Sequence, residues 1–196
     1  MGFGMNATEA ATAAARLRRV AGFLQQDPDN AALPGDACDA ALACASHAEA
    51  QAFLSSASRL RLQGPAWQLR RAHLCIAQGE LDQARTLLEQ LHAANGAHPA
   101  LAHDLAYVCL LQGKAEAAHA LLAPWAEGEF GGGGMPQDLL QALWLRACHH
   151  LDRTEEGWQW AQRAQASQAL RPGAAGVASL IALDMDEADS ARLLAD

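Results

Sequence analysis

Apolar residues recur along this chain at helical spacing, and the pattern returns after 34 residues. The stretch LCIAQGELDQARTLL at 74–88 reappears as VCLLQGKAEAAHALL at 108–122. Within residues 81–93, leucine and alanine follow the i, i+3, i+4, i+7 spacing of one buried face on an amphipathic helix. Gly79 and Gly113, in the middle of the two copies, allow the chain to reverse. The pattern therefore predicts pairs of helices joined by tight turns.

The same period extends over most of the chain when Gly79 and Gly113 are taken as position 15 of a 34-residue unit. Small residues then recur at positions 8 and 20, leucine at position 24 and proline at position 1. Five extra residues around a glycine-rich segment shift the fourth unit, in which Gly157 takes position 20 and Leu145 replaces the small residue at position 8. Position 8 holds Cys38, Ala72 and Ala106, and position 20 holds Ala50, Ala84 and Ala118.

We expect these units to form one repeat domain. Pro124 should end or kink the helix in which it lies, because proline lacks the amide donor. The domain is expected to cover residues 1–196, with an N-terminal helix at about 7–30, repeats at 31–64, 65–98, 99–137 (with a glycine-rich loop at 127–134) and 138–171, and a partial repeat at 172–196.

The period, the paired helices, the turn glycines, the small residues and the position-1 prolines resemble the tetratricopeptide repeat family over about residues 15–196. The resemblance implies an all-α fold, a right-handed superhelix (α-solenoid) of antiparallel helix pairs. It also implies that the first helices line a concave groove that binds a peptide segment of another protein. The large aromatic residues usual in the first helix are mostly absent here, with Gln68 and Ala102 at position 4.

Mapping the groove positions of the family onto this chain gives an apolar set with basic and imidazole groups. Tyr107 is the expected anchor, because a large rigid ring with a polar tip is favoured at interfaces. The expected partner contacts are Leu69, Arg70, His73, His103, Asp104, Tyr107, Leu110, Arg146 and His149.

Composition and charge narrow the classes of partner. The 196 residues are 51% hydrophobic and carry a net charge of −8, which argues against nucleic acid as a partner. No apolar run reaches the roughly 18 residues needed to span a membrane. The N-terminus lacks a secretory pattern, and the five cysteines lack disulfide-like or zinc-like pair spacing, so a cytoplasmic location is expected.

No residue pattern predicts a catalytic, cofactor or metal site. The thiols of Cys75, Cys109 and Cys148 share position 11, where a small apolar side chain is expected to pack against the partner helix. Three consecutive helical residues, such as 148–150 with one cysteine and two histidines, cannot converge on one ion. The carboxylates at 155–156 and 184–187 are expected at helix starts, where the helix dipole favours them.

The leading hypothesis is therefore a non-enzymatic scaffold or adaptor that binds a protein segment in the groove. One alternative is a chaperone similar to those of type III secretion. A second is a small-molecule or metal-dependent enzyme with its site in the histidine-rich groove. Weak self-association through the C-terminal edge is also expected, because terminal repeats need a polar outer face and residues 180–194 are rich in leucine.

Overall fold

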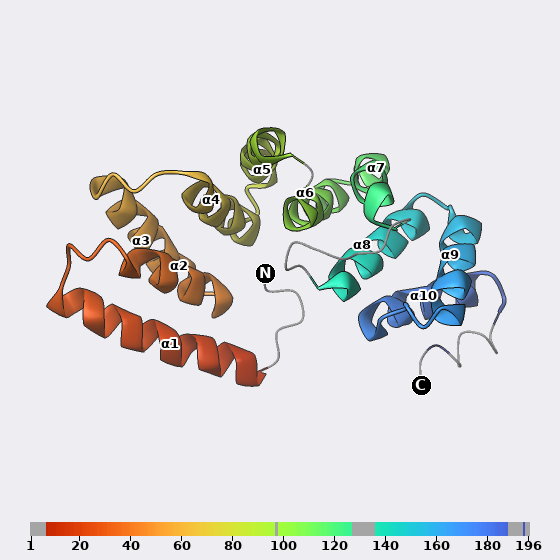
Figure 1. Cartoon of the computed structure of the whole chain (residues 1–196), viewed down its shortest axis with the longest axis horizontal. Coiled ribbons are helices and arrows are strands. Elements are labelled where there is room, and N and C mark those ends of the chain that lie inside the picture. The colour runs from red at the N-terminus through yellow and green to blue at the C-terminus, as the bar shows by residue number, and fades with distance from the viewer. Residues whose placement is uncertain (1–6, 97, 127–135, 188–193, 195–196) are drawn as a thin grey trace. The chain divides into compact units, whose positions relative to one another are not determined.

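A computed structural model describes residues 7–96, 98–126, 136–187 and 194 of the chain (Figure 1). The described residues form helices joined by short turns and contain no strand, which confirms the all-α prediction. The helices are α1 (Ala7–Gln26), α2 (Leu33–Ala43), α3 (His47–Arg59), α4 (Pro65–Gln78), α5 (Leu81–Asn95), α6 (Pro99–Leu111), α7 (Ala115–Ala126), α8 (Gln137–His150), α9 (Thr154–Ala166) and α10 (Pro172–Asp184).

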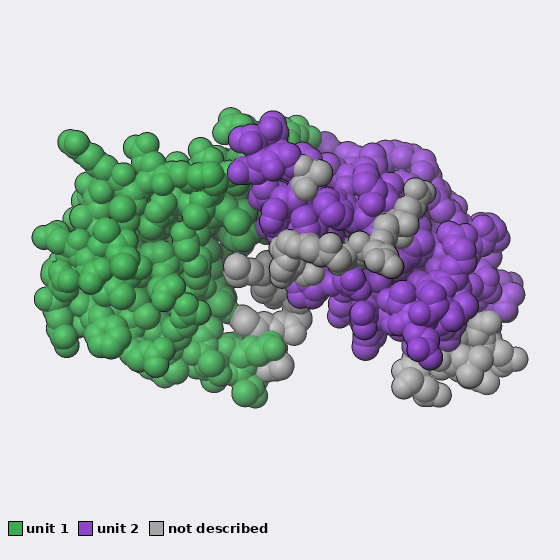
Figure 2. All heavy atoms as spheres, viewed as in Figure 1, with its two compact units in different colours: residues 1–91 green, residues 92–196 purple. Residues whose placement is uncertain are grey.

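Two compact units divide the chain, unit 1 at residues 1–91 and unit 2 at residues 92–196 (Figure 2). Unit 1 holds α1 to α4 and most of α5, and unit 2 holds α6 to α10. The expected continuous repeat domain stays a prediction. None of the described helices is both long and apolar enough to cross a membrane.

The core of unit 1 forms where α1, α2, α3 and α4 pack side by side. Leu17 of α1, Leu54 of α3 and Leu74 of α4 meet small residues of α2 there, and each of these leucines is at most 5% exposed. On the surface, Arg16 of α1 pairs with Asp36 of α2 at 3.1 Å. Apolar burial thus attaches the N-terminal helix to the first repeat.

Small residues at positions 8 and 20 let the two helices of each pair approach closely. Ala72 and Ala84 are fully buried in one repeat, and Ala106 and Ala118 are fully buried in the next. In the first repeat, the thiol of Cys38 lies 3.9 Å from the carbonyl oxygen of Ala50 across the pair. Burial of these residues confirms the packing role predicted for both positions.

The fourth repeat reaches the same closeness by a different pair of residues. Leu145 at position 8 is fully buried, and position 20 across from it is Gly157. A Cβ atom added at Gly157 would lie 3.5 Å from Leu145 Cδ2, 3.3 Å from Cys148 Cβ and 3.1 Å from Ile181 Cδ1. The large leucine is therefore accommodated because its neighbour has no side chain.

Position 15, in the turn between paired helices, adopts a left-handed backbone in all five repeats. The φ angle is 57° at Ala45, 79° at Gly79, 71° at Gly113, 54° at Asp152 and 60° at Asp186. Glycine adopts this conformation at little cost, whereas a residue with a Cβ atom is strained there. The prediction that a glycine lets the chain reverse thus holds for two repeats. In the other three repeats, an alanine or aspartate adopts the strained left-handed backbone.

One local prediction was wrong, one was wrong in part, and two predicted features lie outside the described residues. Helix α7 does not end at Pro124 but continues to Ala126, because a proline so near the C-terminal end removes only one late amide donor; a kink at this residue stays a prediction. Asp184 ends α10 and does not start a helix. The glycine-rich loop at 127–134 and most of the second part of the partial repeat, including residues 188–193, fall outside the described residues.

Helix α8 holds the start of α10 through two side chains in unit 2. The carboxylate of Asp138 accepts a hydrogen bond from the Ala174 amide at 3.1 Å. Gln141 is 1% exposed, donates to the Ala169 carbonyl at 3.1 Å and accepts from the Arg171 amide at 3.1 Å. These bonds satisfy backbone groups of the linker between α9 and α10 and of the first turn of α10. They keep α10 beside α8.

Candidate functional site

Large apolar side chains gather on the first helices of unit 2. Among the residues that the structure describes, five large apolar side chains are exposed, and four of them belong to α6, α8 and α10. Helix α8 packs beside both α6 and α10, so the three helices form a continuous layer. We call this surface the unit 2 face; its residues are Tyr107, Leu110, Leu111, Leu139, Arg146, His149, Leu180 and Leu183.

Helical spacing and one electrostatic interaction between neighbouring helices place these residues on a common surface. Tyr107 and Leu111 are four residues apart, and Leu139 and Arg146 are seven apart, so each pair shares one side of its helix. Arg146 of α8 is close enough to Tyr107 of α6 for its charge to act on the phenol. Figure 1 shows α8 between α6 and α10 within unit 2.

Arg146 is the distinctive charge on this face. Its side chain is exposed and forms no ion pair with any other described residue. Half-burial raises the pKa of Tyr107, and the charge of Arg146 opposes that rise. The unit 2 face thus presents a guanidinium next to an aromatic ring, with leucines on the flanking helices.

Two acidic groups of the same helices, Asp104 of α6 and Asp184 of α10, lie against histidines. His103 Nδ1 lies 3.1 Å from Asp104 Oδ1, and His103 is only 8% exposed. His149 Nε2 of α8 lies 2.6 Å from Asp184 Oδ2 of α10, which fastens the two helices at the surface. Of the predicted contacts, Tyr107, Arg146 and His149 are therefore accessible to a partner, whereas His103 is largely enclosed.

The three remaining predicted contacts lie in unit 1. Arg70 makes bidentate bonds of 2.8 and 2.7 Å to Asp39, and its guanidinium lies 4.8 Å over the ring of Trp67. The hydrogen bond from its side chain to Asp39 is the main cause that raises the pKa of Arg70. Leu69 and His73 are half-buried on the same helix. A single groove that joins all nine predicted residues stays a prediction.

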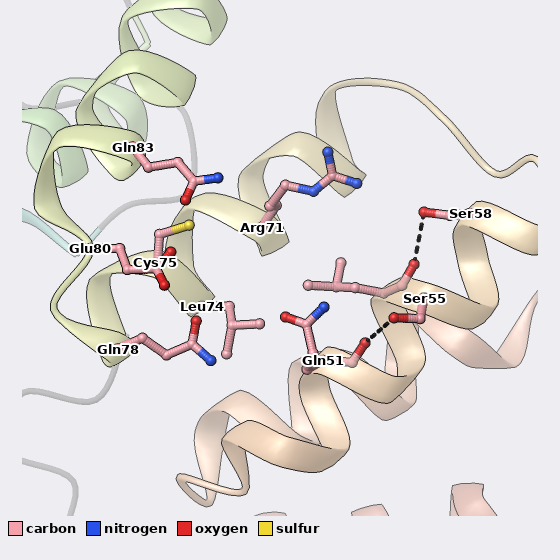
Figure 3. Close-up of a pocket in the computed structure, with 10 residues that line it drawn as sticks. Gln51, Ser55, Ser58, Arg71, Leu74, Cys75, Gln78, Glu80 and Gln83 are labelled. Atoms are coloured by element: carbon pink, nitrogen blue, oxygen red, sulfur yellow. Dashed lines mark hydrogen bonds between the residues drawn. The ribbon is translucent and has the colours of Figure 1, made fainter.

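A polar cleft of about 330 Å³ opens between α3, α4 and α5 of unit 1 (Figure 3). Its charged lining residues are Arg71 and Glu80, beside the buried thiol of Cys75. Burial, followed by the charge of Glu80, raises the pKa of Cys75, so the thiol is protonated at neutral pH and is a poor nucleophile. The cleft therefore shows no activated catalytic group.

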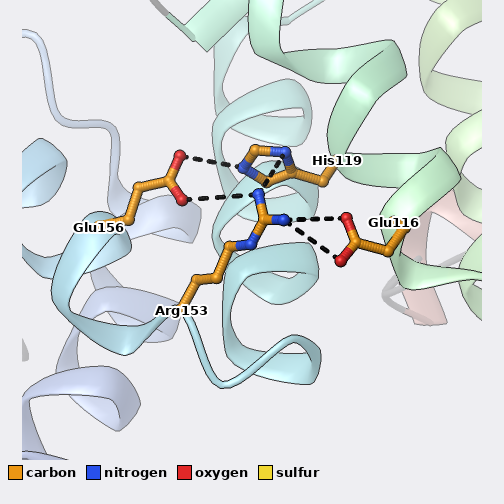
Figure 4. Close-up of polar contacts among 4 residues, drawn as sticks. All are labelled: Glu116, His119, Arg153 and Glu156. Atoms are coloured by element: carbon orange, nitrogen blue, oxygen red, sulfur yellow. Dashed lines mark hydrogen bonds and ion pairs between the residues drawn. The ribbon is translucent and has the colours of Figure 1, made fainter.

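A polar cluster that sequence reasoning missed joins the third and fourth repeats (Figure 4). Arg153 Nη2 bonds both oxygens of Glu116 at 3.0 and 3.2 Å. Its Nη1 lies 3.5 Å from His119 Nδ1, and His119 Nε2 lies 3.1 Å from Glu156 Oε1. Because the guanidinium of Arg153 can only donate, His119 Nδ1 accepts a hydrogen bond from it and Nε2 donates one to Glu156.

Metal-ligand atoms also converge at this cluster. His119, Cys148 and Glu156 each offer a ligand atom, and all three atoms lie within 4.8 Å of one another. A metal ion bound at His119 Nε2 would require the imidazole proton to lie on Nδ1. That proton would then face the donor groups of the Arg153 guanidinium. Burial is also the main cause that raises the pKa of the Cys148 thiol to about 12. The arrangement therefore favours an inter-repeat clamp over a metal centre.

Comparisons with known proteins find a family match and several structures of similar fold. Residues 75–130 match the family model described as tetratricopeptide repeat. No curated protein matches the chain. Among solved structures, BtubC (BKLC) from P. vanneervenii has a TM-score of 0.63 at 16% identity, covering 97% of this chain and 89% of its own.

Two further structures give the same result. MamA MSR-1 has a TM-score of 0.60 at 16% identity, covering 84% of this chain and 92% of its own. YrrB, a tetratricopeptide repeat protein with an unusual peptide-binding site, has a TM-score of 0.59 at 11% identity, covering 89% and 88%. The family match therefore covers residues 75–130, and the related folds show that the chain as a whole has the helical fold of tetratricopeptide repeat proteins.

Proposed function

We propose that this protein is a non-enzymatic scaffold that binds a peptide segment of another protein on the unit 2 face. The observation that carries the proposal is the concentration of exposed leucines on α6, α8 and α10, because apolar patches on a protein surface mark interaction sites. Repeat proteins present such first-helix surfaces to partners. The peptide-binding site of YrrB, a structure of the same fold, is consistent with this use.

Tyr107 is the proposed anchor for the segment. It lies one helical turn before Leu110 and Leu111 on the same side of α6 and is near the charge of Arg146. Its side chain is half-buried, so its ring is already partly held. A rigid aromatic residue loses little conformational freedom on binding, which concentrates binding energy at such positions. The chaperone alternative would use the same surface for a longer segment, and a cytoplasmic location stays a prediction.

A peptide-display selection on the full chain tests the proposal. Selected peptides should bind wild-type protein and lose about 1–3 kcal/mol of binding free energy on Tyr107→Ala. Tyr107→Phe is the matched control, since it keeps the ring and removes only the hydroxyl. Circular dichroism during urea unfolding must show that Tyr107→Ala remains folded. Peptides that bind Tyr107→Ala as tightly as wild type would contradict the proposed face.

A further inference from the structure

The unit 2 face combines exposed apolar area with the charge of Arg146, for which the described part of the chain supplies no ion-pair partner. Leu111 is 47% exposed, Leu180 57% and Leu183 54%, so they flank the α8 surface from both sides. Arg146 lies on α8 between them and forms no ion pair with a described residue. A partner that covers the leucines would therefore also have to accommodate a guanidinium.

Other charges on this face do not offer an alternative pairing. The carboxylate of Asp184 is taken by His149 at 2.6 Å, and that of Asp104 lies 3.1 Å from His103. A basic side chain from a partner would therefore meet carboxylates that already have a histidine beside them. An acidic side chain finds Arg146 without displacing any described residue, and burying the guanidinium unpaired would be costly.

From this charge pattern we infer that the segment bound on the unit 2 face carries a carboxylate flanked on both sides by large apolar residues. The inference rests on the proposed function and names the chemistry of its partner. The carboxylate pairs with Arg146, for which the planar guanidinium allows two parallel hydrogen bonds. The apolar residues cover Leu111 on α6 and Leu180 and Leu183 on α10.

Binding of such a segment is specific to the unit 2 face, because the negative net charge of the protein disfavours acidic partners elsewhere. The chain has a net charge of −8, so an acidic segment gains nothing from general attraction. Its binding depends on the one local guanidinium and on the apolar contacts beside it. This predicts a short acidic-apolar motif and not a generally acidic tail.

Charge reversal at Arg146 provides the test. Peptides selected on the full wild-type chain should carry Asp or Glu between two large apolar residues. Arg146→Glu should weaken such peptides about tenfold or more and should favour Lys or Arg at the same place in a new selection. Arg163→Glu is the matched control, because it makes the same charge change on an exposed residue of α9 and should alter affinity by less than about twofold.

The outcomes separate this inference from the proposed function. If peptides lose affinity on Leu183→Asp and on Tyr107→Ala but show no acidic preference and tolerate Arg146→Glu, the partner chemistry is wrong while the face stands. If no peptide depends on Tyr107 or Leu183, both proposals are wrong. A stable dimer that Leu183→Asp dissociates, together with a failure of every selected peptide to bind, would assign the leucines to a second copy and overturn the inference.

Discussion

Leu145 and Gly157 show at the scale of single residues how one repeat departs from the pattern and remains packed. Three repeats place small residues at both positions 8 and 20, whereas the fourth places a buried leucine against a glycine. The pair conserves the space between the helices and not the residue types. Because protein interiors are densely packed, a substitution at either position alone should lower the stability of the fold.

We therefore expect a strong coupling between these two positions. Gly157→Ala gains up to about 1 kcal/mol of helix propensity but places a Cβ 3.1 Å from Ile181 Cδ1 and 3.3 Å from Cys148 Cβ, so the net effect should be destabilising by about 1–2 kcal/mol. Leu145→Ala should cost about 2–4 kcal/mol through the cavity it leaves. The double variant should be more stable than the sum of the single effects, measured by urea unfolding. Simple additivity would show that the two side chains do not share the space.

Two buried thiols should make stability sensitive to alkaline pH. Burial is the main cause that raises the pKa of Cys38 from 9.0 to about 11 and that of Cys148 to about 12. A pKa raised in the folded state gives stability that is complete below pH 9 and is lost as pH rises through 11–12. Complete ionisation would remove about 3 kcal/mol at Cys38 and about 4 kcal/mol at Cys148.

Urea midpoints between pH 8 and pH 10.5 measure this loss. Cys148→Ala should show a shallower fall than wild type, because the group that must ionise is gone. Cys44→Ala, at a half-buried thiol of unit 1, is the matched control. Equal slopes for wild type and Cys148→Ala would contradict the expected contribution.

The turn between paired helices is the element that the sequence describes least completely. Position 15 is left-handed in every repeat, yet it carries alanine or aspartate in three of them. Alanine has no side-chain bond to offset the strain, so Ala45 stores more of it than a glycine would. Because Ala45 is exposed, only the backbone decides the effect of a substitution.

Ala45→Gly should accordingly stabilise unit 1 by about 0.5–1 kcal/mol, after the entropy that glycine adds to the unfolded chain. Gly79→Ala, at the equivalent turn with φ of 79°, is the reverse experiment and should destabilise by about 1 kcal/mol. Thermal unfolding of both variants checks the pair. A loss of stability in Ala45→Gly would mean that strain at this turn is relieved elsewhere.

Most helix boundaries could be predicted because position-1 prolines and apolar spacing act locally. The polar clamp could not, since Glu116 with Arg153 and His119 with Glu156 each join residues 37 positions apart. The 34-residue period alone does not bring these pairs together, because five extra residues separate the third and fourth repeats. Likewise, the sequence placed Arg70 in the groove, but its bond to Asp39 depends on how α4 packs against α2.

The exposed leucines of α10 also matter for the behaviour of the whole molecule in solution. Leu180 and Leu183 are more than half exposed, whereas Ile181 is fully buried and Leu194 is 8% exposed. Leu193 lies outside the described residues. The apolar edge expected from the sequence is thus narrower, but it retains two leucines one helical turn apart.

We predict weak self-association through these two leucines at high protein concentration. The reason is that two leucines bury too little area for a stable dimer, for which about 1,200–2,000 Å² is usual. Sedimentation velocity should show a concentration-dependent rise in mass that Leu183→Lys abolishes, whereas Leu111→Lys on α6 should leave it unchanged. A bound acidic-apolar peptide should suppress the association, because both events cover Leu180 and Leu183. A strict monomer at every concentration, in wild type and Leu183→Lys alike, would contradict the predicted self-association.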